Sequence, residues 1–159
     1  MRRELLLLLW VSVACNPRTT RPYFPPVTGA AQAEIRLNQK NATSALADVL
    51  RSDSLPLIRV AASDGYLETA WFNSASKRPT GARRLGPNVV QVRAWIDPTR
   101  QGYSLITVET LYRPLADPSL SPRDLDRQVP TDHPVGKRMT EIVTELAKLY
   151  SPEPAGEKQ

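Results

Sequence analysis

The hydrophobic positions of this chain repeat with two periods, one typical of strands and one typical of helices. In the stretch QAEIRLN, Ala33, Ile35 and Leu37 alternate with polar residues, which predicts a half-buried strand. The next stretch has a helical period, which we expect to begin at a capping Asn41 and to end before Pro56. The apolar positions of this predicted helix are Ala42, Ala45, Leu46, Val49 and Leu50.

Alternation typical of strands then returns in four stretches. PLIRVAAS and YLETAWFN are separated by Asp64 and Gly65, and this pair between two alternating runs is typical of a β-hairpin. VVQVRAWID and YSLITVETLYR are also joined by a short turn, so we expect neighbouring strands to be antiparallel. The residues expected on the apolar face of each strand are Ile58, Val60 and Ala62, then Leu67, Thr69 and Trp71, then Val90, Val92, Ala94 and Ile96, and finally Ile106, Val108, Thr110 and Tyr112.

A second amphipathic helix follows a proline-rich loop at residues 114–134. Two such helices need an apolar sheet face to cover, so we predict an α+β fold over residues 31–150. In this two-layer sandwich, two helices cover one face of an antiparallel sheet of four to five strands, in the order β-α-β-β-β-β-α. The apolar stripe of the second helix is Val135, Met139, Ile142, Val143, Leu146, Leu149 and Tyr150.

The amino-terminal residues have the layout of a secretion signal. Two basic residues, Arg2 and Arg3, follow the initiating methionine. Residues 5–14 are an apolar run, which is long enough for a signal peptide but too short to span a membrane. Small residues then lead to Cys15, the only cysteine of the sequence. This stretch resembles a bacterial lipoprotein signal, agreeing at Ala14 and Cys15 and departing at Ser12, where that family usually has leucine.

The resemblance implies a signal peptide at residues 1–14 and a lipid anchor on Cys15, which would attach the protein to a membrane. The alternative is a plain signal peptide that is cut elsewhere, with Cys15 incidental. Asn16 is not the aspartate that retains such lipoproteins at the inner membrane, so the resemblance favours the cell envelope and the periplasmic face of the outer membrane.

The sequence between the anchor and the domain is rich in proline. Residues 15–30 contain four prolines, cannot form a helix and predict an extended tether. Within it, Tyr23 and Phe24 are either chance residues or a segment that docks on the domain or on a partner. At the other end of the chain, residues 151–159 predict a polar, flexible tail.

The stretch SDGYLETAWFN, followed by the two long alternating strands, resembles the domains of the C-subunit lipoprotein of the outer-membrane β-barrel assembly (BAM) machine. The resemblance covers residues 33–150 and implies a helix-grip arrangement of sheet and helices. That subunit has two such domains and a long amino-terminal segment, whereas this chain has one predicted domain and a short tether. A shared fold does not by itself determine a shared function.

The composition and the motifs of the sequence limit the kinds of chemistry that we expect of this protein. One cysteine excludes an internal disulfide, and a net charge of +5 is compatible with several kinds of partner. The motifs of phosphate-binding loops, dinucleotide folds, zinc proteases and serine hydrolases are absent from the sequence. The acidic cluster Asp124, Asp126, Asp132 and His133 has no recognised metal-ligand spacing, and we expect loop solvation and helix capping there, with Asp132 near the last helix. We therefore expect no catalysis, no metal and no cofactor.

We expect a non-enzymatic, membrane-anchored lipoprotein that acts as a protein-interaction module for another envelope protein, in outer-membrane assembly or maintenance. The alternative is a binding module for a small apolar or lipidic ligand held between helix and sheet. Nucleic acid is not an expected partner, because no aromatic residue interleaves with the charges of the basic loop at residues 74–88. On the face away from the helices, Trp95 either binds a partner or is packed by a loop or by the tether. The candidate interaction residues are Trp95, Arg93, Tyr23, Phe24, Arg83 and Arg84.

Overall fold

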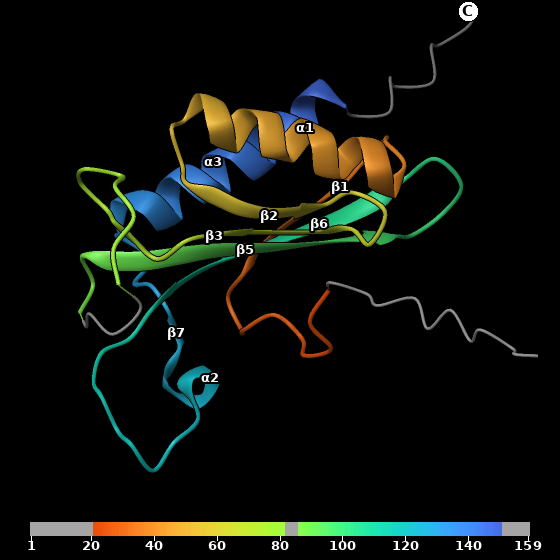
Figure 1. The fold of residues 1–159 in the computed structure, drawn as a ribbon. Helices are drawn as coiled ribbons and strands as arrows, with labels where there is room; N and C mark the ends of the chain where they lie inside the picture. Colours follow the sequence, from red (N-terminus) through yellow and green to blue (C-terminus); the bar gives the residue numbers. More distant parts are fainter. Residues whose placement is uncertain (1–20, 82–85, 151–159) are drawn as a thin grey trace, which may run out of the picture.

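Within residues 21–81 and 86–150, which the computed structural model describes, seven strands form one antiparallel sheet (Figure 1). Five strands run in the order β1-β6-β5-β3-β2, and the two short strands β4 and β7 pair with β5 and β6. The strands are β1 Ala31–Ile35, β2 Leu57–Ala61, β3 Tyr66–Thr69, β4 Phe72–Asn73, β5 Val89–Pro98, β6 Ser104–Tyr112 and β7 Arg127–Gln128.

The two long helices, α1 Gln39–Ser52 and α3 Pro134–Leu149, cover the same face of this sheet (Figure 1). The short helix α2 Pro122–Leu125 lies on the opposite side, below the sheet in Figure 1. The predicted α+β class, with two helices over one face of an antiparallel sheet, is therefore confirmed. We call the face away from α1 and α3 the helix-free face.

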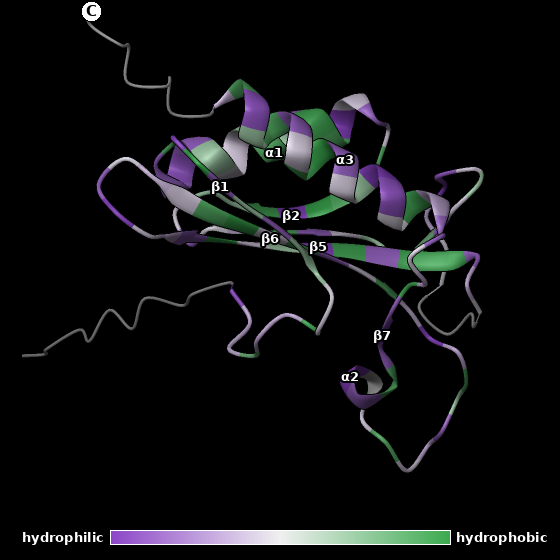
Figure 2. Cartoon of the chain, turned by 180° about the vertical axis from the view of Figure 1, so that it is seen from behind, coloured by the Kyte–Doolittle hydropathy of each residue, from purple (hydrophilic) through white to green (hydrophobic). Residues whose placement is uncertain are grey.

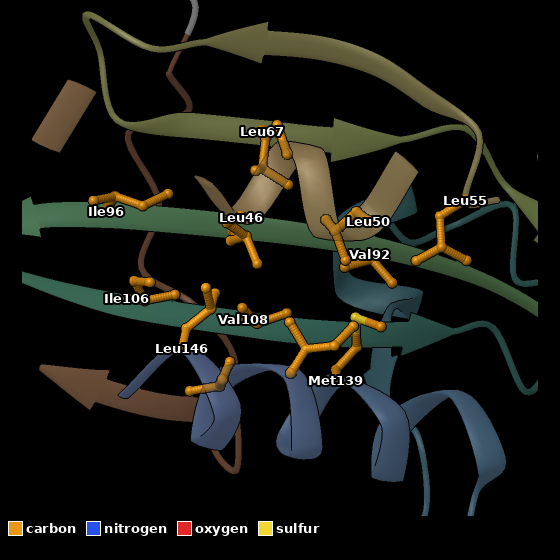
Figure 3. Packing of buried hydrophobic residues seen from close by; sticks show 14 of the residues in the cluster. Leu46, Leu50, Leu55, Leu67, Val92, Ile96, Ile106, Val108, Met139 and Leu146 are labelled. Carbon is orange, nitrogen blue, oxygen red and sulfur yellow. The ribbon is translucent and has the colours of Figure 1, made fainter. Parts of the chain in front are cut away.

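The core lies between the helices and the sheet. Leu46 of α1 and Met139 of α3 meet Val92 and Val108, which project from the two central strands (Figure 3). The alternation along β5 that places every second side chain in this layer is visible as alternating colour in Figure 2. The largest side chains fully buried in the layer are Ile35, Leu46, Leu50, Leu67, Phe72, Ile96, Ile106, Met139 and Ile142.

The predicted hairpin between β2 and β3 is confirmed. The two strands are antiparallel neighbours, and Gly65 in their turn has φ +63°, a backbone conformation that glycine adopts without a steric cost. A Cβ atom at this position would lie 2.2 Å from the carbonyl oxygen of Ile96 and 2.4 Å from Nε2 of Gln39. The turn therefore needs glycine for its conformation and also for the close approach of β5 and α1.

The prediction that Trp71 faces the helices is wrong, and Phe72 takes the core position instead. Both β3 and β4 pair with β5, but the register shifts by one residue between the pair Glu68 and Arg93 and the pair Phe72 and Val90. One extra residue on one strand is a β-bulge, and it inverts the alternation of side chains beyond it.

The prediction that Ile58 and Val60 face the core is also wrong, because they are 64% and 37% exposed. They belong to β2, which is an edge strand, and its pairing with β3 is irregular between Leu57 and Arg59. Leu57 packs against the core in their place.

The cap of α1 is not the expected Asn41, and the cap of α3 lies within the cluster where helix capping was expected. The side chain of Asn38 accepts a hydrogen bond from the amide of Asn41, so Asn38 is the cap of α1. His133, and not Asp132, caps α3: its Nδ1 accepts from the amide of Val135, and its Nε2 lies 2.9 Å from the carbonyl oxygen of Pro87.

Candidate interaction face of the sheet

On the helix-free face, β5 places Val89, Gln91, Arg93 and Trp95 opposite its core residues, as its alternation predicts. All four are buried, Trp95 to 1% exposure. Their cover consists of residues 21–30 and of the segment that contains α2 and β7, which lie on this side of the sheet (Figure 1). The helix-free face is therefore covered by other parts of the same chain.

Phe24 is the centre of the amino-terminal cover. Its ring packs edge-on against Trp95, with the ring centroids 6.0 Å apart and an angle of 66° between the planes. The guanidinium groups of Arg93 and Arg123 lie over the Phe24 ring, 5.0 Å and 3.9 Å from its centroid. The neighbouring Tyr23 is 96% exposed, so the two aromatic residues of the predicted tether have different surroundings.

Arg21 fixes the beginning of this segment. Its guanidinium lies 2.6 Å from a carboxylate oxygen of Asp97 in β5 and also donates to the carbonyl oxygen of Asp64. Among the alternatives left open by the sequence, the structure therefore shows docking on the domain for Phe24, and tether packing for Trp95.

A buried ion network lies beneath the cover. Arg93 Nε donates to Glu109 Oε1 at 2.5 Å, and its other end lies 3.6 Å from Asp126. Arg113 donates to Asp126 at 2.7 Å. The amide of Val27 donates to the second oxygen of Glu109 at 2.8 Å, so the amino-terminal segment supplies a hydrogen bond to the network.

The environment of Glu109 is unusual for a carboxylate. Its side chain is fully inaccessible to solvent, and this burial raises the pKa of its carboxyl group. Arg93 and the amide of Val27 act in the opposite direction, because each stabilises the ionised form. Two donors, one from the sheet and one from the covering segment, therefore stabilise the ionised form of Glu109.

A second apolar cluster lies beside this network. Trp71, displaced by the bulge, packs with Val89 and Leu111 on the helix-free face, and Val27 packs against them. The guanidinium of Arg113 lies 4.5 Å from the centroid of a Trp71 ring. Residues 21–27 thus contribute two apolar side chains to the cover of the sheet, Phe24 at one end and Val27 at the other.

Trp95 also packs edge-on against Tyr66, with centroids 5.4 Å apart. Its Nε1 has no hydrogen-bond acceptor among the described residues, so the cover provides ring contacts but no hydrogen bond to this indole. A shallow hollow of about 510 Å³ adjoins it, lined by Arg21 to Pro26, Trp95 and Asp97.

The residues of the acidic cluster have different surroundings. Asp126 belongs to the buried network, and Asp124 accepts a hydrogen bond from Ser121, the residue that caps α2. Asp132 is exposed beside the capping His133. The four residues therefore do not converge on a common site, and within the described part of the chain no three His, Cys, Asp or Glu residues are placed to hold a metal ion.

Other expected site residues lie outside the described ranges: Cys15 with the signal peptide, Arg83 and Arg84 of the basic loop, and the tail at residues 151–159. Lys77 of the same basic loop donates to the carbonyl oxygen of Asp53 at the end of α1.

Glu109 and Arg113 are not among the site residues predicted from the sequence. The alternation of β6 puts Glu109 opposite Val108, and the hairpin register pairs Glu109 directly with Arg93. Two opposite charges at paired positions of a predicted hairpin were the available signal.

A comparison of the sequence with models of known protein families gives no match, and neither does a comparison with curated proteins. Among the helices that the structure describes, none combines the length and the apolar character needed to cross a membrane.

Proposed function

We propose that this protein is a non-enzymatic envelope lipoprotein, anchored through Cys15, whose α+β domain acts as a protein-interaction module in the assembly or maintenance of the outer membrane. The observation that carries the proposal is the sequence around Cys15, where an apolar run and small residues precede the only cysteine. The docked Arg21 supports it, since this residue contacts the domain and lies only six positions beyond the cysteine.

The packing supports a protein partner over a small ligand. The layer between the helices and the sheet is filled by large apolar side chains (Figure 3), and the hollow beside Trp95 lies on the other side of the sheet. The edge strand β2 presents Ile58 and Val60 to solvent, and an exposed edge with apolar side chains is a place where another chain adds a strand.

The anchor is tested by metabolic labelling with an alkyne analogue of palmitate and by mass spectrometry of the membrane fraction. We expect a mature chain that begins with an acylated Cys15, and loss of labelling in Cys15→Ser. The matched control is Ser12→Leu, which brings the stretch closer to the lipoprotein pattern and should keep the label. An unmodified mature chain that begins at residue 16 or later would contradict the proposal.

The partner is tested by photo-crosslinking in cells from position 58 on the β2 edge, with position 44 on the exposed side of α1 as the control. We expect a discrete crosslinked envelope protein from position 58 and not from position 44. If neither position yields a crosslinked protein, the interaction-module proposal is wrong while the anchor result stands separately.

A further inference from the structure

We infer that the helix-free side of the domain lies against the bilayer that holds the anchor, with Tyr23, Leu115 and Leu120 in the lipid interface. We call these three residues the membrane-facing residues. The inference rests on the proposed lipid anchor at Cys15. It goes beyond that proposal because it assigns one side of the domain to a lipid surface and leaves the β2 edge for a protein.

The amino-terminal segment leaves the domain on the helix-free side. Arg21 is held by Asp97, and Phe24 is held between Trp95 and two guanidinium groups. These contacts attach the segment to the helix-free side of the sheet (Figure 1). The anchor is therefore connected to this side, and not to the side covered by α1 and α3.

The length of chain between the anchor and the domain is short. If residues 16–30 were a free tether, they would reach about 45 Å in an extended conformation. Because Arg21 is docked, only residues 16–20 remain, and the six Cα–Cα steps from Cys15 to Arg21 span at most about 22 Å. The 10-residue strand β5 alone is about 33 Å long, so a domain on such a short connection cannot turn freely above the membrane.

The helix-free side, to which the anchor is connected, has exposed apolar residues. Tyr23 is 96% exposed, Leu115 52% and Leu120 45%, and together they are half of the six large hydrophobic residues that are exposed within the described chain. Tyr23 adjoins the docked Phe24, and the loop that carries both leucines leaves β6 and descends on the side of α2 in both ribbon views (Figures 1 and 2). Tyrosine is enriched at membrane–water interfaces, where its ring meets the apolar boundary and its hydroxyl stays in water.

Arg123 connects these parts into one surface. Its guanidinium stacks on Phe24 from the start of α2, three residues after Leu120. An exposed arginine beside apolar residues is suited to the interface, because its stem contacts apolar material and its charge remains near the headgroups. The contact of Arg123 with Phe24 therefore links the docked amino-terminal segment to the loop that carries Leu115 and Leu120, on the same side of the sheet.

The test uses the mature, acylated protein reconstituted in vesicles of phosphatidylethanolamine and phosphatidylglycerol. The thioether on Cys15 leaves an introduced cysteine as the only free thiol, since the chain has no other cysteine. An environment-sensitive fluorophore is attached in Ala116→Cys, beside Leu115, or in Ser44→Cys on α1, both exposed positions. Lipids with a quencher near the headgroup should quench the fluorophore at position 116 at least twofold more than at position 44.

Two variants examine the cause of the orientation. Inserting eight glycine and serine residues between Thr20 and Arg21 leaves the described domain unchanged and should reduce the difference between the two positions. Phe24→Ala combined with Arg21→Ala should reduce it as well, because the segment is released while the anchor remains.

Equal quenching at positions 116 and 44 in the vesicle-bound protein would overturn the inference and leave the lipid anchor intact. A second labelled thiol at Cys15, or failure of the protein to associate with vesicles, would instead overturn the proposed anchor and with it this inference.

Discussion

Arg93→Met removes the guanidinium that contacts both buried carboxylates of the helix-free face. After this change the amide of Val27 is the one donor that Glu109 retains among the described residues, whereas Asp126 keeps Arg113 at 2.7 Å. Glu109 is fully inaccessible, so its charge would be buried with little compensation. Removing one partner of a buried ion pair typically costs about 3–5 kcal/mol, and we expect a loss of this size in the free energy of unfolding.

Glu109→Gln changes the other partner of the same ion pair and should cost less. The amide oxygen introduced at position 109 still accepts from Val27, and Arg93 keeps Asp126, 3.6 Å away. The expected loss is about 1–3 kcal/mol, as for a weakened buried hydrogen bond. The double variant Arg93→Met/Glu109→Leu removes both charges and should lie within about 1 kcal/mol of the unchanged protein, because buried ion pairs are often replaceable by apolar residues.

The measurement is equilibrium urea unfolding at neutral pH, followed by tryptophan fluorescence. With a slope of about 1–3 kcal/mol per molar urea, the expected difference between the two single variants is a shift of the midpoint by roughly 1 M. The reasoning is refuted if Arg93→Met costs no more than Glu109→Gln, or if the double variant is as unstable as Arg93→Met. Either result would mean that the buried Glu109 does not depend on Arg93 for its compensation.

Two further predictions concern the helix side of the sheet. Gly65→Ala should destabilise the domain by more than about 2 kcal/mol, since the added Cβ meets backbone at 2.2 Å, while Gly102→Ala, with a positive φ but open space, should cost about 1 kcal/mol; thermal unfolding of both variants tests the difference. Hydrogen bonds from Arg138 lower the pKa of Asp53, despite partial burial, so Asp53 contributes stability above the ordinary aspartate value of 3.8 that is lost as the pH falls through its folded pKa. Asp53→Asn should flatten the acid limb of a plot of melting temperature against pH, and an unchanged limb would contradict this.

Because the helix-free face is covered, the aromatic residues predicted to bind a partner are interpreted differently once the structure is known. Alternation correctly places Trp95 and Arg93 away from the core, which makes them candidates for a binding surface. Their burial depends on Phe24 and on α2, and alternation within β5 carries no information about either. The exposed aromatic residue of the pair is Tyr23, and this difference between neighbours follows only from how the segment docks.

Local errors in the predicted fold have a similar origin. A strand prediction assumes unbroken alternation, and the bulge before Phe72 breaks it without a glycine or proline to mark the site. In the same way, Ile58 and Val60 have the pattern of a core strand but lie at the sheet edge, where one side has no neighbour. Strand order is a property of the whole sheet, so the stretch itself could not reveal this position.

The sequence by itself determined the two long helices and the five longer strands, the antiparallel hairpins, the face of β5 and β6 that meets the helices, and the expectation of an anchor at Cys15, whereas α2 and β7 lie in a stretch predicted as a loop. These features depend on residues that are neighbours in the chain, because side-chain periodicity and turn chemistry act over a few positions. The tertiary structure decided what covers the helix-free face. Arg21 and Asp97 are 76 residues apart and Val27 and Glu109 are 82 apart, and such contacts form only when the sheet has brought distant segments together.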